Sequence, residues 1–127
     1  MEFDLNELDK GSVFLYIDEG GRDHIITKEE ALFKVSDCIY TVKVEGMEHL
    51  CQESSSVHLF ISPKGAASFS PHTDDVDLEI RCVEGVKEFD VDGIRHTLNI
   101  GDSLRIDKGV RHRGINNQCS ITLSIQV

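Results

Sequence analysis

From residue 78 to its end, the chain is a series of short alternating segments divided by turn signals. Leu78–Val83 alternates apolar and polar residues almost to its end, and Ser120–Val127 alternates strictly. Glu84-Gly85 is expected to interrupt the first segment, which resumes at Val86–Val91. The turn signals that follow are Asp92-Gly93, Gly101-Asp102 and Asp107-Lys108-Gly109. Strands that alternate with period two, with turns roughly every 8 to 12 residues, are typical of an all-β sandwich or barrel. We therefore predict an all-β fold with one or two short helices near the N-terminus.

A candidate metal site begins just before this region. His72 and Asp74 form a His-x-Asp pair, and His112 follows 40 residues later, far enough for the chain to return to the same place. A strand places residues i and i+2 on one side, so His72 and Asp74 can reach the same ion. Two imidazoles and one carboxylate are the ligand set that holds non-haem iron(II) on one face. Taken alone, a His-x-Asp pair is common and indicates no site.

The surrounding residues resemble a known family. Gly101 to Asn116 fits every spacing of the second cupin motif, except that Asp107 stands where Pro is usual. The first motif has His72-x-Asp74 instead of the usual His-x-His, which resembles the Jumonji-type cupins, the iron(II)/2-oxoglutarate oxygenases. Leu59–Val76 is most similar to the ribosomal-oxygenase (cupin-4) group. The resemblance covers His58–Val127 and implies a double-stranded β-helix, or cupin jelly-roll barrel, as a minimal single-domain version.

The same resemblance implies 2-oxoglutarate as co-substrate and Lys87 as the residue that binds its distal carboxylate. Lys87 stands 15 positions after His72, as the co-substrate lysine or arginine does in those relatives, and Gly85 stands 13 after it. The local pattern agrees, because Lys87 shares a strand face with Phe89 and Val91. Burying the charge of a lysine on such an apolar face lowers stability unless an anion neutralises it. The alternative is an exposed face along which the lysine stem lies with its ammonium in water.

Two further residues are expected in the co-substrate pocket. His58 stands 14 positions before His72, where the relatives usually have Asn, and Phe60 replaces their Tyr. The predicted function is iron(II)- and 2-oxoglutarate-dependent hydroxylation of a protein or peptide side chain, or of a small molecule. His72, Asp74 and His112 would hold the iron, with no catalytic residue beyond these ligands.

Two other functions stay open. Ordinary cupins add a Glu about seven residues after the first His, and Glu79 stands at that distance from His72. A four-ligand site with Glu79 would suit an isomerase or a dioxygenase that needs no 2-oxoglutarate. Against it, Glu79 shares its parity with Asp77 and Arg81, a charged set typical of an outer strand face. The third function is a non-enzymatic sensor or interaction module.

Composition bounds the organisation and the partners. The 127 residues suffice for one domain, residues 1–127, with N-terminal strands and helices in 1–56 and the core barrel with the metal site in 57–127. A net charge of −10 argues against nucleic acid and is compatible with a basic protein or peptide substrate. Four scattered cysteines and an acidic start without an apolar run indicate a cytoplasmic protein that contacts no membrane.

The front third carries no motif. Thr27 and Glu30 have the spacing of a capping box, before a helix whose apolar face would contain Ala31, Leu32 and Val35. Edge strands such as Val13–Ile17 or Ser120–Val127 need covering, and pairing with a second copy is a common solution. We therefore expect a homodimer.

Overall fold

The computed structural model describes residues 13–18, 20, 22–31, 40–51 and 56–127. Besides a helical turn at residues 28–31, they form ten strands and one short 3-10 helix, η2. In chain order these are β1 (Val13–Ile17), β2 (Asp23–Ile26), β3 (Thr41–Glu45), η2 (Glu48–Leu50), β4 (Val57–Ser62), β5 (Leu78–Gly85), β6 (Lys87–Val91), β7 (Ile94–Leu98), β8 (Ser103–Ile106), β9 (His112–Ile115) and β10 (Ser120–Gln126).

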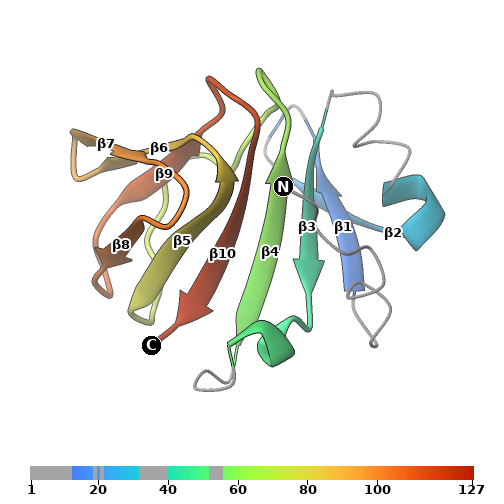
Figure 1. The fold of residues 1–127 in the computed structure, drawn as a ribbon, viewed down its shortest axis with the longest axis horizontal. Helices are drawn as coiled ribbons and strands as arrows, with labels where there is room; N and C mark the ends of the chain where they lie inside the picture. The colour runs from blue at the N-terminus through green and yellow to red at the C-terminus, as the bar shows by residue number, and fades with distance from the viewer. Residues whose placement is uncertain (1–12, 19, 21, 32–39, 52–55) are drawn as a thin grey trace.

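The strands form two antiparallel sheets. The larger has the order β2-β1-β3-β4-β10-β5-β8, and the smaller has the order β7-β6-β9. The expectation that β1 and β10 are edge strands was wrong, because each is paired on both sides and the edges of the large sheet are β2 and β8. The small sheet lies beside β5 and β8, so the chain curls into a partly closed barrel (Figure 1). The prediction of an all-β jelly-roll barrel is confirmed. The strands before residue 57 are continuous with the large sheet, since β3 pairs directly with β4.

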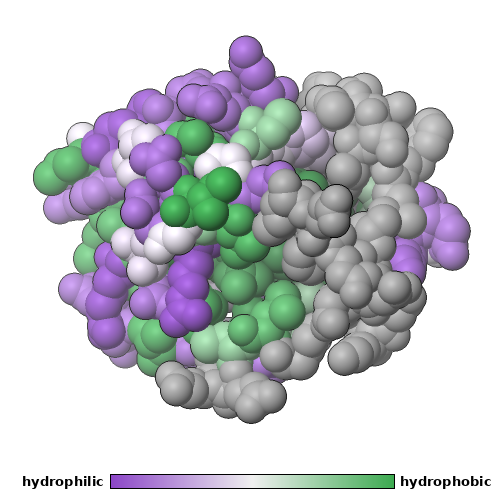
Figure 2. Space-filling view, in the orientation of Figure 1, coloured by the Kyte–Doolittle hydropathy of each residue, from purple (hydrophilic) through white to green (hydrophobic). Residues whose placement is uncertain are grey.

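Alternate residues of the strands lie on the two faces of the large sheet, and the two faces have different surroundings. On β10, Leu123 and Ile125 join an apolar cluster that also contains Val42, Val44 and Leu59. The residues between them, such as Thr122 and Ser124, line a cavity on the opposite face. Figure 2 shows apolar residues gathered in the middle of one side of the molecule, with hydrophilic residues around the β6–β7 hairpin. The face of the large sheet that carries Thr122 and Ser124 is therefore the interior of the barrel.

The N-terminal capping box is present. The Thr27 hydroxyl accepts a hydrogen bond from the Glu30 amide (3.2 Å), and the Glu30 carboxylate accepts one from the Thr27 amide (3.4 Å). Residues 28–31 are helical, and Ala31 is buried in the apolar cluster. The expected helix positions Leu32 and Val35 lie outside the described residues. No described helix has both the length and the hydropathy needed to cross a membrane.

The predicted break between the segments 78–83 and 86–91 is present, but it lies at Val86. β5 continues through Gly85, which pairs with Ser120 of β10, and β6 begins at Lys87 in the small sheet. Gly85 has φ of +71°, and a Cβ there would lie 2.0 Å from the Cys119 carbonyl oxygen. Only glycine permits this close approach, at the point where the chain turns from the large sheet into the small one. The bend leads directly into β6 and places Lys87 inside the barrel.

The predicted turn at Asp92-Gly93 is confirmed. Both residues have positive φ, +50° and +81°, as a two-residue type I′ hairpin turn requires. The turn joins β6 to β7 in the register Val91↔Ile94. Because the register is fixed, Lys87 and Phe89 face inward while Glu88 and Asp90 face outward, where both contact Arg95.

Candidate metal and co-substrate site

The two histidines of the candidate triad lie directly opposite each other on neighbouring extended segments. The His72 amide donates to the His112 carbonyl (3.0 Å), and the His112 amide donates to the His72 carbonyl (2.9 Å). The ring centroids are 4.5 Å apart. Asp74 lies two residues after His72. A backbone hydrogen bond fixes its position, since the Gly109 amide donates to the Asp74 carbonyl (3.0 Å). The local backbone therefore brings three side chains together that are far apart in sequence.

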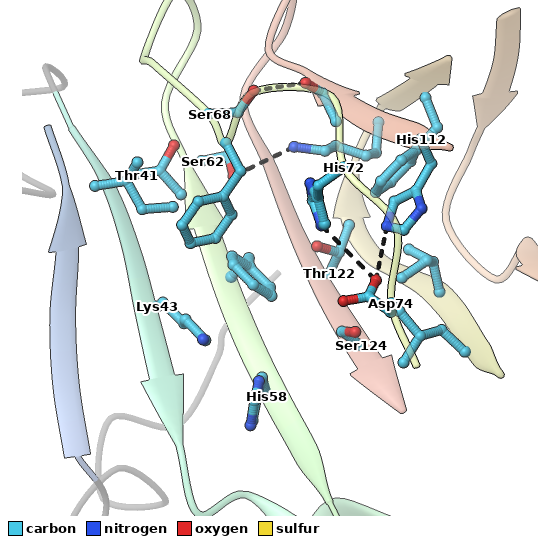
Figure 3. A pocket seen from close by; sticks show the side chains of 18 of the residues that line it. Thr41, Lys43, His58, Ser62, Ser68, His72, Asp74, His112, Thr122 and Ser124 are labelled. Carbon is cyan, nitrogen blue, oxygen red and sulfur yellow. Dashed lines mark hydrogen bonds and ion pairs between the residues drawn. The ribbon is translucent and has the colours of Figure 1, made fainter. Parts of the chain in front are cut away.

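The three side chains converge through specific atoms. Asp74 Oδ2 lies 3.0 Å from His112 Nε2 and 3.7 Å from His72 Nε2. One ligand atom from each residue lies within 4.8 Å of the other two. His112 is buried, whereas His72 and Asp74 are partly open to the cavity. The group therefore has one closed side, toward the small sheet, and one open side (Figure 3).

Hydrogen bonding fixes which nitrogen each imidazole offers. His72 Nδ1 lies 2.8 Å from the Ser70 carbonyl oxygen, and His112 Nδ1 lies 2.9 Å from that of Val110. A carbonyl can only accept, so each Nδ1 carries the hydrogen and each neutral ring has its lone pair on Nε2. This is the usual way in which a backbone carbonyl orients a metal-ligating histidine.

With both rings neutral, this group of three side chains has no hydrogen-bond donor at its centre. Two Nε2 lone pairs and the Asp74 carboxylate face one another, and acceptors at these distances repel unless a cation lies between them. Two nitrogens and one carboxylate oxygen suit a divalent first-row metal, and the open side leaves positions for other ligands. The residues present therefore fit a metal ion of the kind that the sequence predicts.

Lys87 lies in the same cavity and is almost completely buried, with 4% of its surface exposed. Its ammonium donates to Asn116 Oδ1 (2.6 Å) and to Ser62 Oγ (3.4 Å), and lies 5.6 Å from the centroid of the Phe89 ring. Among the described residues, no carboxylate forms an ion pair with it. Burial lowers the pKa of Lys87 from 10.5 to about 8. The structure thus holds a buried cation without a counter-charge.

Asn116 fixes the position of that cation. Its amide nitrogen donates to the Thr41 hydroxyl (3.2 Å) and to the Ala66 carbonyl (2.9 Å), which turns its oxygen toward Lys87. The sequence matched Asn116 as the last residue of the second cupin motif but gave it no role in the site. Thr41, in the part of the chain that carried no motif, was missed, because only the sheet pairing brings it near Asn116.

The cavity between the two sheets has a volume of about 570 Å³. The triad and Lys87 line it, and so do both residues predicted for the co-substrate pocket, His58 and Phe60. Burial, with a smaller contribution from Lys43, lowers the pKa of His58. Ser62 lies four residues beyond His58 on β4, which corresponds to about 13 Å along a strand. The prediction that His58 contacts the co-substrate stays a prediction.

Glu79, the candidate fourth ligand, lies on the other face of β5. Its carboxylate accepts a hydrogen bond from Arg81, and its cross-strand partner is Arg105. Its neighbour Ile80 faces the cavity. The metal-ligand group within the described residues does not include Glu79.

Comparison with protein families finds that the cupin domain matches residues 58–124. No curated protein matches the chain. Among solved structures, the ribosomal oxygenase YcfD of Escherichia coli is similar in fold, with a TM-score of 0.72 and 17% identity over 94% of this chain. Its complex with cobalt and 2-oxoglutarate gives a TM-score of 0.70, with 16% identity and 94% coverage. An RmlC-like cupin from Shewanella frigidimarina gives 0.56, with 22% identity, over 66% of this chain and 72% of its own. This chain covers about 40% of YcfD.

Proposed function

Because the chain belongs to the cupin domain family, we propose that it is an iron(II)- and 2-oxoglutarate-dependent oxygenase. The observation that carries this proposal is the presence, in one cavity, of an acceptor-only triad and a buried lysine without a counter-charge. The triad needs a cation, and the lysine needs an anion. A metal-bound dicarboxylate would satisfy both requirements at once.

In this proposal His72, Asp74 and His112 hold the metal through Nε2, a carboxylate oxygen and Nε2. When bound, iron would supply the oxidative chemistry that couples decarboxylation of 2-oxoglutarate to oxidation of a substrate C–H bond. The protein's part is to orient and to exclude water. The Ser70 and Val110 carbonyls keep the two imidazoles in the tautomer that binds metal.

Lys87 would bind the distal carboxylate of 2-oxoglutarate by a charge-assisted hydrogen bond. Its ammonium has three donors, and Asn116 and Ser62 accept two of them, which leaves one for a ligand. With a pKa of about 8, most Lys87 side chains are charged at pH 7. A bound carboxylate would favour the charged form further. Phe60 and Phe89 line the cavity with apolar surface, which strengthens that interaction by excluding water.

One comparison and one structural observation support this proposal. The YcfD complex contains cobalt and 2-oxoglutarate in a chain with a similar fold. In addition, the four-ligand alternative, a metal cupin that works without 2-oxoglutarate, requires Glu79 at the metal, and Glu79 faces away from the cavity. Hydroxylation of a protein or peptide side chain, or of a small molecule, is the reaction class that follows from the resemblance to ribosomal oxygenases.

The experiment is uncoupled turnover. The protein is loaded with iron(II) without oxygen, and succinate formation from 2-oxoglutarate is measured after air is admitted. We expect succinate from the wild type and none from His112→Ala, whose metal site is incomplete. Wild-type protein shown to contain iron that produces no succinate above the His112→Ala background would refute the oxygenase activity.

A further inference from the structure

The cavity has a second polar end, formed by the register of three strands. Lys43 of β3 lies opposite Phe60 of β4, which in turn lies opposite Thr122 of β10. In the next row, His58 lies opposite Ser124. All five side chains line the cavity. Adjacent rows on one face are about 6.6 Å apart, so Lys43, His58 and Ser124 form a compact group.

This group lies away from the proposed co-substrate position, so it assigns His58 to a second ligand in place of the co-substrate contact expected from the sequence. Lys87 contacts Ser62, which is four residues, or about 13 Å of strand, from His58. The cavity of about 570 Å³ is within the range of roughly 300 to 1,000 Å³ typical of small-molecule sites. A five-carbon dicarboxylate held between the triad and Lys87 would leave the end near His58 free. Figure 3 shows Lys43 and His58 directed into this end.

Lys43 is a second largely buried cation. Its side chain is 13% exposed, and its ammonium lies 3.3 Å from Glu45 Oε1 and 5.8 Å from the centroid of the Phe69 ring. Glu45 is more exposed, at 37%, and does not line the cavity. One carboxylate uses one of the three ammonium donors, so donors remain for a ligand. The neighbouring His58 ring and Ser124 hydroxyl add neutral hydrogen-bonding groups, which can complete a site for a carboxylate.

We propose that Lys43, His58 and Ser124 bind the carboxylate of the primary substrate, which is therefore an organic acid small enough to enter the cavity. That this acid is the oxidised substrate rests on the proposed oxygenase function, whereas the anion site itself does not. The net charge of −10 opposes the approach of any anion. Inside the cavity, the buried Lys87 and the largely buried Lys43 provide the local positive charge that offsets this repulsion.

The experiment follows the His58 ring by NMR in zinc-loaded protein, with acetate as the probe, in the presence and absence of 2-oxoglutarate. Acetate bound beside His58 should raise the pKa of this ring, because an anion favours the imidazolium form. Lys43→Met keeps the length of the side chain and removes its charge, and should weaken acetate binding at least roughly tenfold. Glu45→Gln removes the competing carboxylate and should strengthen acetate binding.

Lys87→Met separates the two sites. This variant should lose affinity for 2-oxoglutarate while the response of His58 to acetate stays as in the wild type. If 2-oxoglutarate does not bind but acetate still shifts His58, the co-substrate assignment fails and the anion site stands. No change in the pKa of His58 with acetate, or an unchanged response in Lys43→Met, would overturn the proposal. So would an equal loss of 2-oxoglutarate affinity in Lys43→Met and Lys87→Met, since Lys43 would then belong to the co-substrate site.

Discussion

The amides of His72 and His112 each donate to the carbonyl of the other, so the two residues form one closed hydrogen-bonded pair. In such a pair the side chains lie on the same face of the sheet. Both rings therefore point toward Asp74, and the same backbone segments orient them through the Ser70 and Val110 carbonyls. Backbone hydrogen bonds therefore fix the positions and the orientations of the two rings.

The first prediction concerns the metal. His72→Ala and His112→Ala should each abolish stoichiometric binding of iron(II) or manganese(II), because two ligands leave too little affinity. Metal content after gel filtration measures this. His24→Ala is the matched control, since His24 is exposed on β2 and pairs with Asp18. Unchanged metal content in both triad variants would refute the site.

The second prediction separates the three-ligand site from the four-ligand site. Glu79→Gln should leave metal affinity nearly unchanged, because Glu79 contacts Arg81 on the outer face of β5. A competition titration against a chelator gives the affinity. If the variant binds metal tenfold more weakly, a change of about 1.4 kcal/mol, Glu79 acts as a ligand and the cupin function without 2-oxoglutarate becomes the better account.

The third prediction uses the pKa of Lys87, which burial lowers from 10.5 to about 8. Between these values the unfolded chain binds more protons than the folded one, so stability contributed by this residue rises with pH. The cost of the buried charge is fully present below pH 8 and disappears toward pH 10.5. The unfolding free energy of the wild type relative to Lys87→Met should therefore rise by about 3 kcal/mol across this interval.

Urea unfolding of metal-free protein at pH 7.5, 8.5, 9.5 and 10.5 measures that difference. The comparison with Lys87→Met cancels the contributions of the other titrating groups. The loss of the donor to Asn116 Oδ1 in the variant adds a constant to this difference and does not change its dependence on pH. A difference that stays constant over this pH range would mean that Lys87 keeps its ordinary pKa and is in contact with water.

The fourth prediction concerns the pH dependence of co-substrate binding. Only the ammonium form of Lys87 can pair with the distal carboxylate, so the Kd for 2-oxoglutarate should rise above pH 8, approaching tenfold for each pH unit. Lys87→Arg stays charged, so its Kd should not change in this range, even if its fork fits less well beside Phe89. Identical pH profiles for the two proteins would exclude Lys87 as the titrating group.

The sequence predicted the candidate triad and the orientation of Lys87 because both depend on local patterns. The His72-x-Asp74 spacing and the alternation of β6 are readable without a structure. The partners of Lys87 were not readable. Asn116 and Thr41 meet only because β3 joins the large sheet, and such non-local pairing leaves no local signal. Lys43 was missed for the same reason.

The conformation of Gly85 shows a different limit. A glycine inside an alternating segment is typical of a turn, but it also permits a bend or a close backbone approach. The Cys119 carbonyl oxygen would lie 2.0 Å from a Cβ at position 85, and Cys119 is 34 residues from Gly85 in the sequence. The sequence around Gly85 does not show whether the glycine serves a turn or a close backbone approach, because the contact with Cys119 decides this.

The central claim is that the triad and Lys87 together bind 2-oxoglutarate. Calorimetric titration of manganese-loaded wild-type protein with 2-oxoglutarate at pH 7, without oxygen, tests it most directly. We predict saturable one-to-one binding, and in Lys87→Ala, with its metal content preserved, a Kd at least roughly 30-fold higher. No binding at millimolar 2-oxoglutarate in metal-loaded wild type, or equal binding by Lys87→Ala, would contradict the account.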